Sequence, residues 1–167
     1  MVEAKRRIIP PEYPIGVISD THGLLRPEAL DALAGSSLII HAGDVGPPDI
    51  LDRLRTIAPV AAVRGNVDTA PWCSVLPAIK IVEHESHVIY VLHDIARLNL
   101  DPVAAGLSAV VYGHSHKPSI ERERGVLFLN PGSACPRRFN LPTTVARLGL
   151  VNGAIAATIV ELGSDPR

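Results

Sequence analysis

Short apolar runs that end in polar clusters are the feature of this chain that most constrains its fold. Three such runs cover residues 15–18, 37–40 and 60–63, and amphipathic stretches at 27–33 and 49–57 separate them. This alternation predicts strands joined by right-handed helical crossovers, and therefore a parallel sheet. Ligands gather at the carboxyl ends of such strands, so the polar residues that follow the runs are candidates for one shared site.

Six later apolar runs, with few helical stretches between them, predict a second and largely antiparallel sheet. One pair is joined by the Asn-Gly dipeptide at 152–153, the strongest short hairpin signal. Another pair flanks a turn at 85–86, beside which His84 and His87 are interpreted as solvated. A short helix is predicted over residues 101–106. The six runs are 79–83, 88–92, 109–112, 126–129, 145–150 and 154–160.

Composition indicates one globular domain over residues 15–167, preceded by a flexible tail at 1–14. The chain has 167 residues, of which 47% are hydrophobic, and this is enough for a substantial core. Its formal net charge of -1 gives no general attraction to nucleic acid or to a membrane. The tail lacks the apolar segment of a secretory signal, and Cys73 and Cys135 read as reduced thiols, so the expected location is cytoplasmic.

Seven potential metal ligands follow the apolar runs. In Gly113-His114-Ser115-His116, two imidazoles stand on alternate residues and can therefore reach the same point. His41 precedes the end of its strand and is interpreted as a packed core histidine. Seven donors are too many for one tetrahedral zinc but enough for two ions that share a carboxylate. Imidazole and carboxylate together suit manganese, iron or zinc better than calcium. The seven residues are Asp20, His22, Asp44, Asn66, His93, His114 and His116.

The order and spacing of five segments resemble the calcineurin-like metallophosphoesterase superfamily. The segments are Asp20-Thr21-His22, Gly43-Asp44, Gly65-Asn66-Val67-Asp68, His93 and Gly113-His114-Ser115-His116. The small size and Asn130-Pro131-Gly132-Ser133 resemble the minimal phosphodiesterase branch of bacteria and archaea, whose fold the eukaryotic retromer subunit shares. The resemblance implies an α/β fold, namely a four-layer α-β-β-α sandwich of two mixed sheets.

The same resemblance implies a metal-dependent phosphoric ester hydrolase, most directly a phosphodiesterase acting on a small phosphate ester. Two divalent ions are implied, with manganese expected and iron, zinc or nickel as alternatives. A hydroxide between the ions would attack phosphorus in line, so Asp44, Asn66 and His114 are the candidate catalytic residues. In the implied ligand set, Asp20, His22 and His116 hold one ion, Asn66, His93 and His114 hold the other, and Asp44 bridges them.

Two positions depart from the superfamily pattern. Many members have a histidine directly after the motif asparagine, where it helps to protonate the leaving group, but this chain has Val67. Valine cannot transfer a proton, although the minimal branch commonly lacks this histidine as well. Asp94 follows His93 where relatives often have glycine, and it adds negative charge beside the second ion. These departures keep an alternative open: a weakly active or inactive interaction scaffold of the same fold. A third hypothesis is that the site hydrolyses an amide or a thioester bond.

Three residues are candidates for substrate contact. Arg64 precedes the Gly-Asn turn and could meet the substrate or pair with Asp68. Asp68 could act through a water molecule, against the alternative of capping the turn. Arg137, like Arg138, follows the Asn-Pro-Gly-Ser turn, and arginine suits bidentate phosphate contact. Trp72 could stack on a base or anchor a loop. Members of the branch often form dimers or larger assemblies, so a homo-oligomer is left open.

Overall fold

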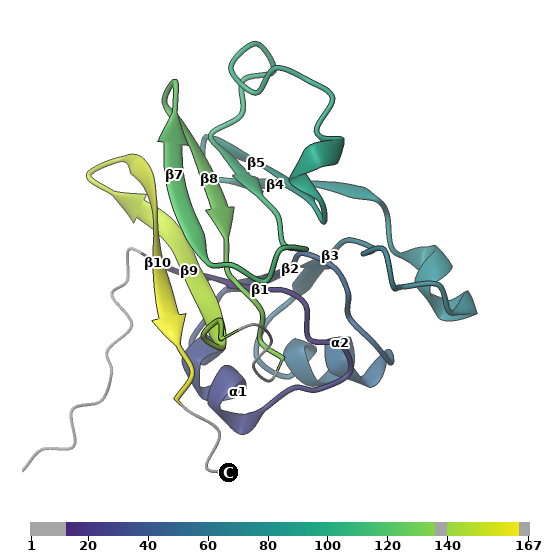
Figure 1. The fold of residues 1–167 in the computed structure, drawn as a ribbon. Coiled ribbons are helices and arrows are strands. Elements are labelled where there is room, and N and C mark those ends of the chain that lie inside the picture. Colours follow the sequence, from purple (N-terminus) through teal and green to yellow (C-terminus); the bar gives the residue numbers. More distant parts are fainter. Residues whose placement is uncertain (1–12, 136–139, 164–167) are drawn as a thin grey trace, which may run out of the picture.

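The computed structural model describes residues 13–135 and 140–163, and in this part of the chain the strands form two five-stranded sheets (Figure 1). The strand orders are β10-β9-β1-β2-β3 and β4-β5-β6-β8-β7. The first sheet consists of β1 (Ile15–Ile18), β2 (Leu38–His41), β3 (Val60–Ala62), β9 (Thr144–Val151) and β10 (Ala154–Glu161). The second consists of β4 (Ile79–His84), β5 (His87–Leu92), β6 (Ala109–Val111), β7 (Ser119–Glu123) and β8 (Val126–Asn130). The predicted tail at 1–14 lies almost entirely outside the described residues.

The parallel part of the first sheet forms as the sequence predicts. β1 pairs in parallel with β2, and β2 with β3. The crossover helices are α1 (Pro27–Leu33) and α2 (Asp49–Arg55). Pro27 stands in the first turn of α1, where a backbone N–H would have no partner within the helix. The second helix ends at Arg55 rather than at Ile57, because the chain turns at Thr56, whose N–H donates to the carbonyl of Arg53.

The predicted hairpin at residues 152–153 is confirmed, and it belongs to the first sheet. β9 pairs antiparallel with β10 on one side and with β1 on the other. Asn152 and Gly153 have φ values of 52° and 78°. Both values lie in the left-handed region that a two-residue hairpin turn favours. The hairpin therefore extends the parallel strands into a mixed sheet.

The expectation of a largely antiparallel second sheet is wrong, because its three central strands run parallel. β5 pairs in parallel with β6, and β6 with β8, while the edge strands β4 and β7 pair antiparallel with their neighbours. The chain returns to the same end of the sheet between β5 and β6, and again between β6 and β8 by way of β7. These three strands therefore run in the same direction. The sequence did not reveal β7, since four of its five residues are exposed and none lies in the core.

The two sheets pack face to face and enclose the main apolar core, with residues from both sheets in one cluster. A second cluster joins α1 and α2 to the outer face of the first sheet (Figure 1). The outer face of the second sheet is covered by residues 94–107, which include the short 3-10 helix η2 (Ile95–Arg97). The predicted sandwich of two mixed sheets is therefore confirmed, with a fourth layer of turns and 3-10 helix.

The prediction of a short helix over residues 101–106 is wrong. Successive turns occupy this segment, in which the N–H of Gly106 donates to the carbonyl of Val103, and Gly106 itself has a φ of 72°. A second 3-10 helix, η1 (Pro71–Val75), follows β3. No helix in residues 13–135 or 140–163 is long and apolar enough to cross a membrane.

The carboxyl ends of β1, β2, β3, β5 and β6 meet at one side of the sandwich. Backbone hydrogen bonds join the loops there: Asp20 N–H donates to the Gly43 carbonyl at 3.0 Å, and Gly113 N–H donates to the His93 carbonyl at 2.9 Å. The Ser133 hydroxyl, after β8, donates to the Asp20 carbonyl at 3.0 Å and so connects the two sheets. This junction holds the candidate site.

Candidate metal centre

All seven predicted ligands come together at the junction of the two sheets. Those of the first sheet follow β1, β2 and β3, and those of the second sheet follow β5 and β6. Two groups of side chains with metal-ligand geometry occur among the described residues, and they share Asp20. The groups are Asp20, His22 and His116, and Asp20, Asp44 and His93.

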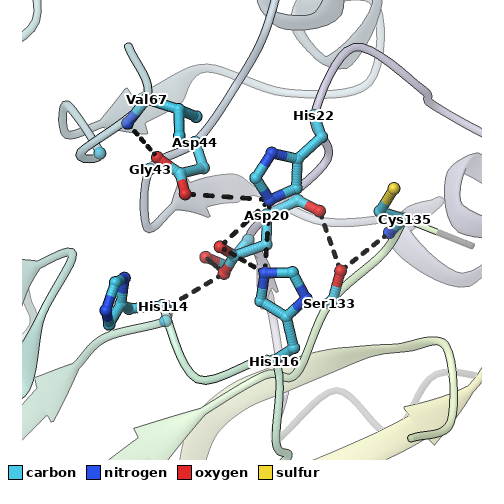
Figure 2. A network of polar contacts seen from close by, with 12 residues as sticks. Asp20, His22, Gly43, Asp44, Val67, His114, His116, Ser133 and Cys135 are labelled. Atoms are coloured by element: carbon cyan, nitrogen blue, oxygen red, sulfur yellow. Dashed lines mark hydrogen bonds and ion pairs between the residues drawn. The ribbon is translucent and has the colours of Figure 1, made fainter. Parts of the chain in front are cut away.

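The first group places a buried carboxylate between two imidazoles. Asp20 Oδ1 lies 3.3 Å from His116 Nε2 and 3.6 Å from His22 Nε2. The two Nε2 atoms are 3.3 Å apart. Figure 2 shows His22 and His116 directed toward the Asp20 carboxylate from different loops. Such convergence of one anionic oxygen and two imidazole nitrogens provides three ligands for one cation.

The second group is arranged around His93. Its Nε2 lies 3.2 Å from Asp44 Oδ2 and 3.0 Å from Asn66 Oδ1. The Asn66 oxygen is also 3.1 Å from His114 Nδ1. His93 Nδ1 lies 2.7 Å from the Ala42 carbonyl, which can only accept, so Nδ1 carries the proton. Nε2 is therefore the nitrogen that faces Asp44 and Asn66 and that would ligate a metal ion.

Asp44 stands between the two groups. Its Oδ2 lies 3.8 Å from His22 Nε2 and 3.2 Å from His93 Nε2. Its other oxygen, Oδ1, accepts a hydrogen bond from the Val67 N–H at 3.0 Å (Figure 2). The carboxylate is thereby oriented with one oxygen toward both sets of imidazoles, as a shared ligand would be.

One buried oxygen indicates that this arrangement suits a cation. Asp20 Oδ1 is fully buried, and it accepts no hydrogen bond from the described residues. A buried, unsatisfied carboxylate oxygen is costly, and a bound cation removes that cost. Carboxylate, amide and imidazole donors together suit divalent manganese, iron or zinc. The residues present therefore fit divalent metal binding.

The backbone at the ligands is unusual. Five of the seven predicted ligand residues have positive φ, between 46° and 71°. This left-handed region is sparsely populated by residues other than glycine, although Asn, Asp and His tolerate it best. Clusters of this kind occur at functional sites, where the surrounding structure holds them. The five residues are Asp20, His22, Asp44, His114 and His116.

Two donors that the sequence did not single out orient Asp20. The Ser19 hydroxyl donates to Asp20 Oδ2 at 2.6 Å, and the backbone N–H of His114 donates to the same oxygen at 3.1 Å. Both donors leave Oδ1 free to face the imidazoles. The only sequence signal for Ser19 is its place directly before Asp20 at the end of a strand.

The environment of Asp68 differs from the one expected of a residue that contacts substrate, which was one of the two roles predicted for it. Its buried carboxylate accepts backbone hydrogen bonds from Asp44 and Val45, each at 2.9 Å, and from Gly65 at 2.8 Å. Both oxygens are thus engaged with the loops that carry Asp44 and Asn66. The alternative of capping the turn describes this position, and Asp68 acts by holding the two loops together.

His41 is fully buried behind the ligands, as expected for a core histidine. Its Nδ1 accepts from the Gly43 N–H at 3.1 Å, so Nε2 carries the proton toward the Thr21 hydroxyl at 3.0 Å. That hydroxyl in turn donates to the Val45 carbonyl at 2.7 Å. Burial lowers the pKa of His41 to about 4, and the ring is therefore neutral at neutral pH.

The acids of the site are ionised at neutral pH. Burial alone would raise the pKa of Asp20, but the polar contacts with His22 and Ser19, together with the nearby imidazoles of His93 and His116, outweigh it and the net pKa is lowered. The pKa of Asp44 is lowered in the same way, since the hydrogen bond to His93 and the Val67 N–H offset burial. In turn, Asp44 raises the pKa of His93 against the effect of its burial. Two adjacent carboxylates thus give the site the negative charge that attracts cations.

Two cavities, each of about 510 Å³, open beside the ligands. We call the first the apolar cavity; it extends from His22 past Val67 to Trp72, Pro47 and Pro48. We call the second the arginine cavity; it is lined by Asn66, His93 and His114 together with Arg64 and Arg97. Arg64, a predicted substrate contact, donates through Nη1 to the Leu76 carbonyl at 3.1 Å. Arg137 and Arg138 lie outside the described residues.

His84 and His87 are remote from this site. Both are half-buried, and His87 Nδ1 lies 3.1 Å from the Ser108 hydroxyl. The interpretation of His87 as solvated is therefore wrong, because β5 brings it against the segment that leads into β6.

Comparison with known proteins identifies the family. The model of the calcineurin-like phosphoesterase superfamily domain matches residues 14–153. A probable metallophosphoesterase of Methanothermobacter thermautotrophicus is 35% identical over 162 residues, covering 90% of this chain and 93% of that protein. The phosphodiesterase YfcE of Escherichia coli K12 is 31% identical over 145 residues, or 69% of this chain and 76% of that protein.

A solved structure shows the same fold at lower identity. The crystal structure of Vps29 from Chaetomium thermophilum has a TM-score of 0.71 and 18% identity, and it covers 90% of this chain and 97% of that one. The match to the domain model extends over most of the described fold, and its range of 14–153 spans every residue of the two ligand groups. The chain therefore belongs to the calcineurin-like phosphoesterase superfamily.

Proposed function

We propose that this metal-dependent phosphoester hydrolase is a phosphodiesterase that uses two divalent ions. In this proposal Asp44 is shared, and the other six ligands divide into two sets of three. The observation that carries the proposal is the position of Asp44 Oδ2, which faces His22 on one side and His93 on the other. The two sets are Asp20, His22 and His116, and Asn66, His93 and His114.

Divalent ions held in this way lower the pKa of bound water and stabilise both the attacking and the leaving oxygens of an in-line displacement at phosphorus. The protein's own contribution is orientation. Ser19 and the His114 N–H fix Asp20, the Val67 N–H fixes Asp44, and Ala42 fixes the tautomer of His93. Because these contacts exist before substrate binds, little reorganisation is needed during the reaction.

The side chain at position 67 favours diesters with good leaving groups. Val67 is about half exposed and lines the apolar cavity beside the ligands, where it offers no proton to a departing oxygen. A leaving group of low pKa departs without such help. We propose manganese as the activating ion, with iron, zinc and nickel as competitors to be compared. The name of the Escherichia coli relative supports diester hydrolysis.

The test is hydrolysis of bis(p-nitrophenyl) phosphate with manganese, and with the monoester p-nitrophenyl phosphate in parallel. Asp44→Ala and Asn66→Ala should each lower the diester rate by about a thousandfold, because losing a metal ligand removes several kcal/mol of transition-state stabilisation. Asp52→Ala is the matched control, because the Asp52 side chain is exposed on α2, away from the predicted ligands, and pairs with Arg55 at 2.9 Å. It should keep the full rate.

One alternative has a specific observation in its favour. The fold is similar to that of Vps29, and Val67 stands where a proton donor could be. Both observations are also expected of an interaction scaffold with the same architecture. Equal low rates for the unchanged protein and the two ligand variants would support that scaffold and reject the phosphodiesterase. A monoester rate above the diester rate would reject the diesterase assignment alone.

A further inference from the structure

The two cavities lie on either side of one turn. Asn66 lines the arginine cavity, while the next residue, Val67, lines the apolar cavity. The ligands stand between them, since His22 belongs to the apolar cavity and His93 to the arginine cavity. A diester bound at the ligands therefore has one space for each of its two arms, and the two spaces differ in chemistry.

The arginine cavity carries two guanidinium groups from separate elements. Arg64 follows β3 and Arg97 ends η2, and both are exposed. Within the described residues, neither has a carboxylate at ion-pair distance. Two other exposed arginines are paired, Arg55 with Asp52 at 2.9 Å and Arg124 with Asp101 at 3.6 Å. Two more, Arg53 and Arg122, donate instead to main-chain carbonyls outside any cavity beside the ligands.

The cavity has a net positive side-chain charge. Asp94 also lines it, and its Oδ1 accepts from the Ala96 N–H at 3.0 Å. Two guanidinium groups against this one carboxylate leave an excess of one positive charge. Guanidinium binds phosphate oxygens in a bidentate fashion and keeps its charge at any physiological pH.

The apolar cavity offers a flat surface. Trp72 and the Pro47-Pro48 pair line it, together with Val67 and Ala70. Trp72 is half-buried, and it packs against the core beneath α1 and α2, so its position is fixed. A fixed indole provides a stacking surface for an aromatic ring or a nucleobase.

We infer that the substrate is an asymmetric phosphodiester, with a second anionic group on one arm and an aromatic ring or nucleobase on the other. The second anion lies against Arg64 and Arg97, and the ring lies against Trp72. This inference rests on the proposed phosphodiesterase function, to which it adds the substrate class.

The experiment compares three dinucleotides in the presence of manganese: dithymidine linked by one phosphodiester, and the same molecule with a further phosphate at its 5′ or its 3′ end. One phosphorylated form should have a kcat/KM about tenfold above that of the plain dinucleotide, as expected for a charge-assisted contact. Arg97→Gln should abolish this preference. Arg55→Gln removes the same charge from α2 and should keep it, while Asp94→Asn should increase it.

A binding measurement separates recognition from turnover. Calorimetry should show that thymidine 3′,5′-bisphosphate binds the manganese-loaded protein more tightly than thymidine 5′-monophosphate does. This difference in affinity should shrink in 0.5 M salt, because the Debye length at that ionic strength is about 4 Å. Arg97→Gln should remove the difference. Trp72→Leu should raise KM for all three dinucleotides and leave the preference among them unchanged.

Failure of this inference can be told apart from failure of the proposed function. If bis(p-nitrophenyl) phosphate is hydrolysed but neither phosphorylated dinucleotide is preferred, the asymmetric substrate is rejected and the phosphodiesterase stands. If Arg97→Gln lowers all three rates by the same factor, Arg97 has a structural role and the inference is rejected. If no diester is hydrolysed by any form of the protein, both proposals are rejected.

Discussion

The loops of the first sheet and the loop after β6 in the second sheet contribute to the metal centre in different ways. Asp20 and Asp44, from the first sheet, are buried, and in each carboxylate one oxygen is held by hydrogen bonds while the other faces the imidazoles. From the second sheet, His114 is exposed and His116 is half-buried. The acids thus belong to the folded core, whereas these two imidazoles stand at its rim. His93, also from the second sheet, is buried and held by the Ala42 carbonyl, so the contrast is between the two acids and the loop after β6. The acids fix where a cation would bind, and the imidazoles after β6 would complete its coordination.

The largest expected effect separates the two sets of loops by stability. Asp68→Ala leaves three buried backbone N–H groups without an acceptor, so the free energy of unfolding of the metal-free protein should fall by about 3 kcal/mol. His114→Asn should change it by less than about 0.5 kcal/mol, because the side chain is exposed and asparagine tolerates its left-handed backbone. Urea denaturation measures both values.

The control is Asp52→Ala, which removes an exposed carboxylate from α2 and should also cost less than about 0.5 kcal/mol. Equal losses for Asp68→Ala and His114→Asn would show that the two sets of loops do not differ in the way described.

The second prediction concerns pH and tests the buried histidine behind the first-sheet ligands. The pKa of His41 is about 4 in the folded protein against an ordinary value of 6.5, so the unfolded chain binds the additional proton between these values. The free energy of unfolding of the metal-free protein should therefore fall as the pH is lowered from about 6.5 to about 4, by a total of about 3 kcal/mol.

The neighbouring groups act outside that window. The raised pKa of His93 contributes stability that is lost only above pH 6.5, and the lowered pKa values of Asp20 and Asp44 matter below about pH 4. His41→Gln should be less stable overall and should show a flatter dependence between pH 4 and 6.5. An unchanged slope in this variant would assign the pH dependence to other groups.

The smallest expected effect lies at the boundary between the two cavities. Val67→His places a proton donor beside the leaving group, and it should raise kcat for the plain dithymidine diester by about tenfold, a fraction of what a well-positioned acid supplies. The rate for bis(p-nitrophenyl) phosphate should change little, because its leaving group needs no proton. Val67→Phe is the size control, and a similar gain in that variant would contradict acid catalysis.

Every residue predicted as a ligand lies within a few positions of the end of an apolar run, which is why the sequence could single these residues out. Asp20, Asp44 and His93 could be identified in this way. For Asp68 the sequence left a substrate contact and a turn cap as alternatives, because the three backbone N–H groups that decide between them come from two loops and become its partners only after folding. A similar limit applies to the parallel centre of the second sheet. Strand direction there depends on crossovers without regular helices, and the polar sequence of β7 shows no alternation.

Ligands from both sheets meet across the seam of the sandwich, and Asp20 Oδ1 lies only 3.3 Å from His116 Nε2. A cation at this position would cross-link two layers of the protein as a disulfide does, but reversibly and under the control of metal supply. The two layers could then separate only after the ion had left. The stability of the protein would in this way rise with the concentration of free metal ion.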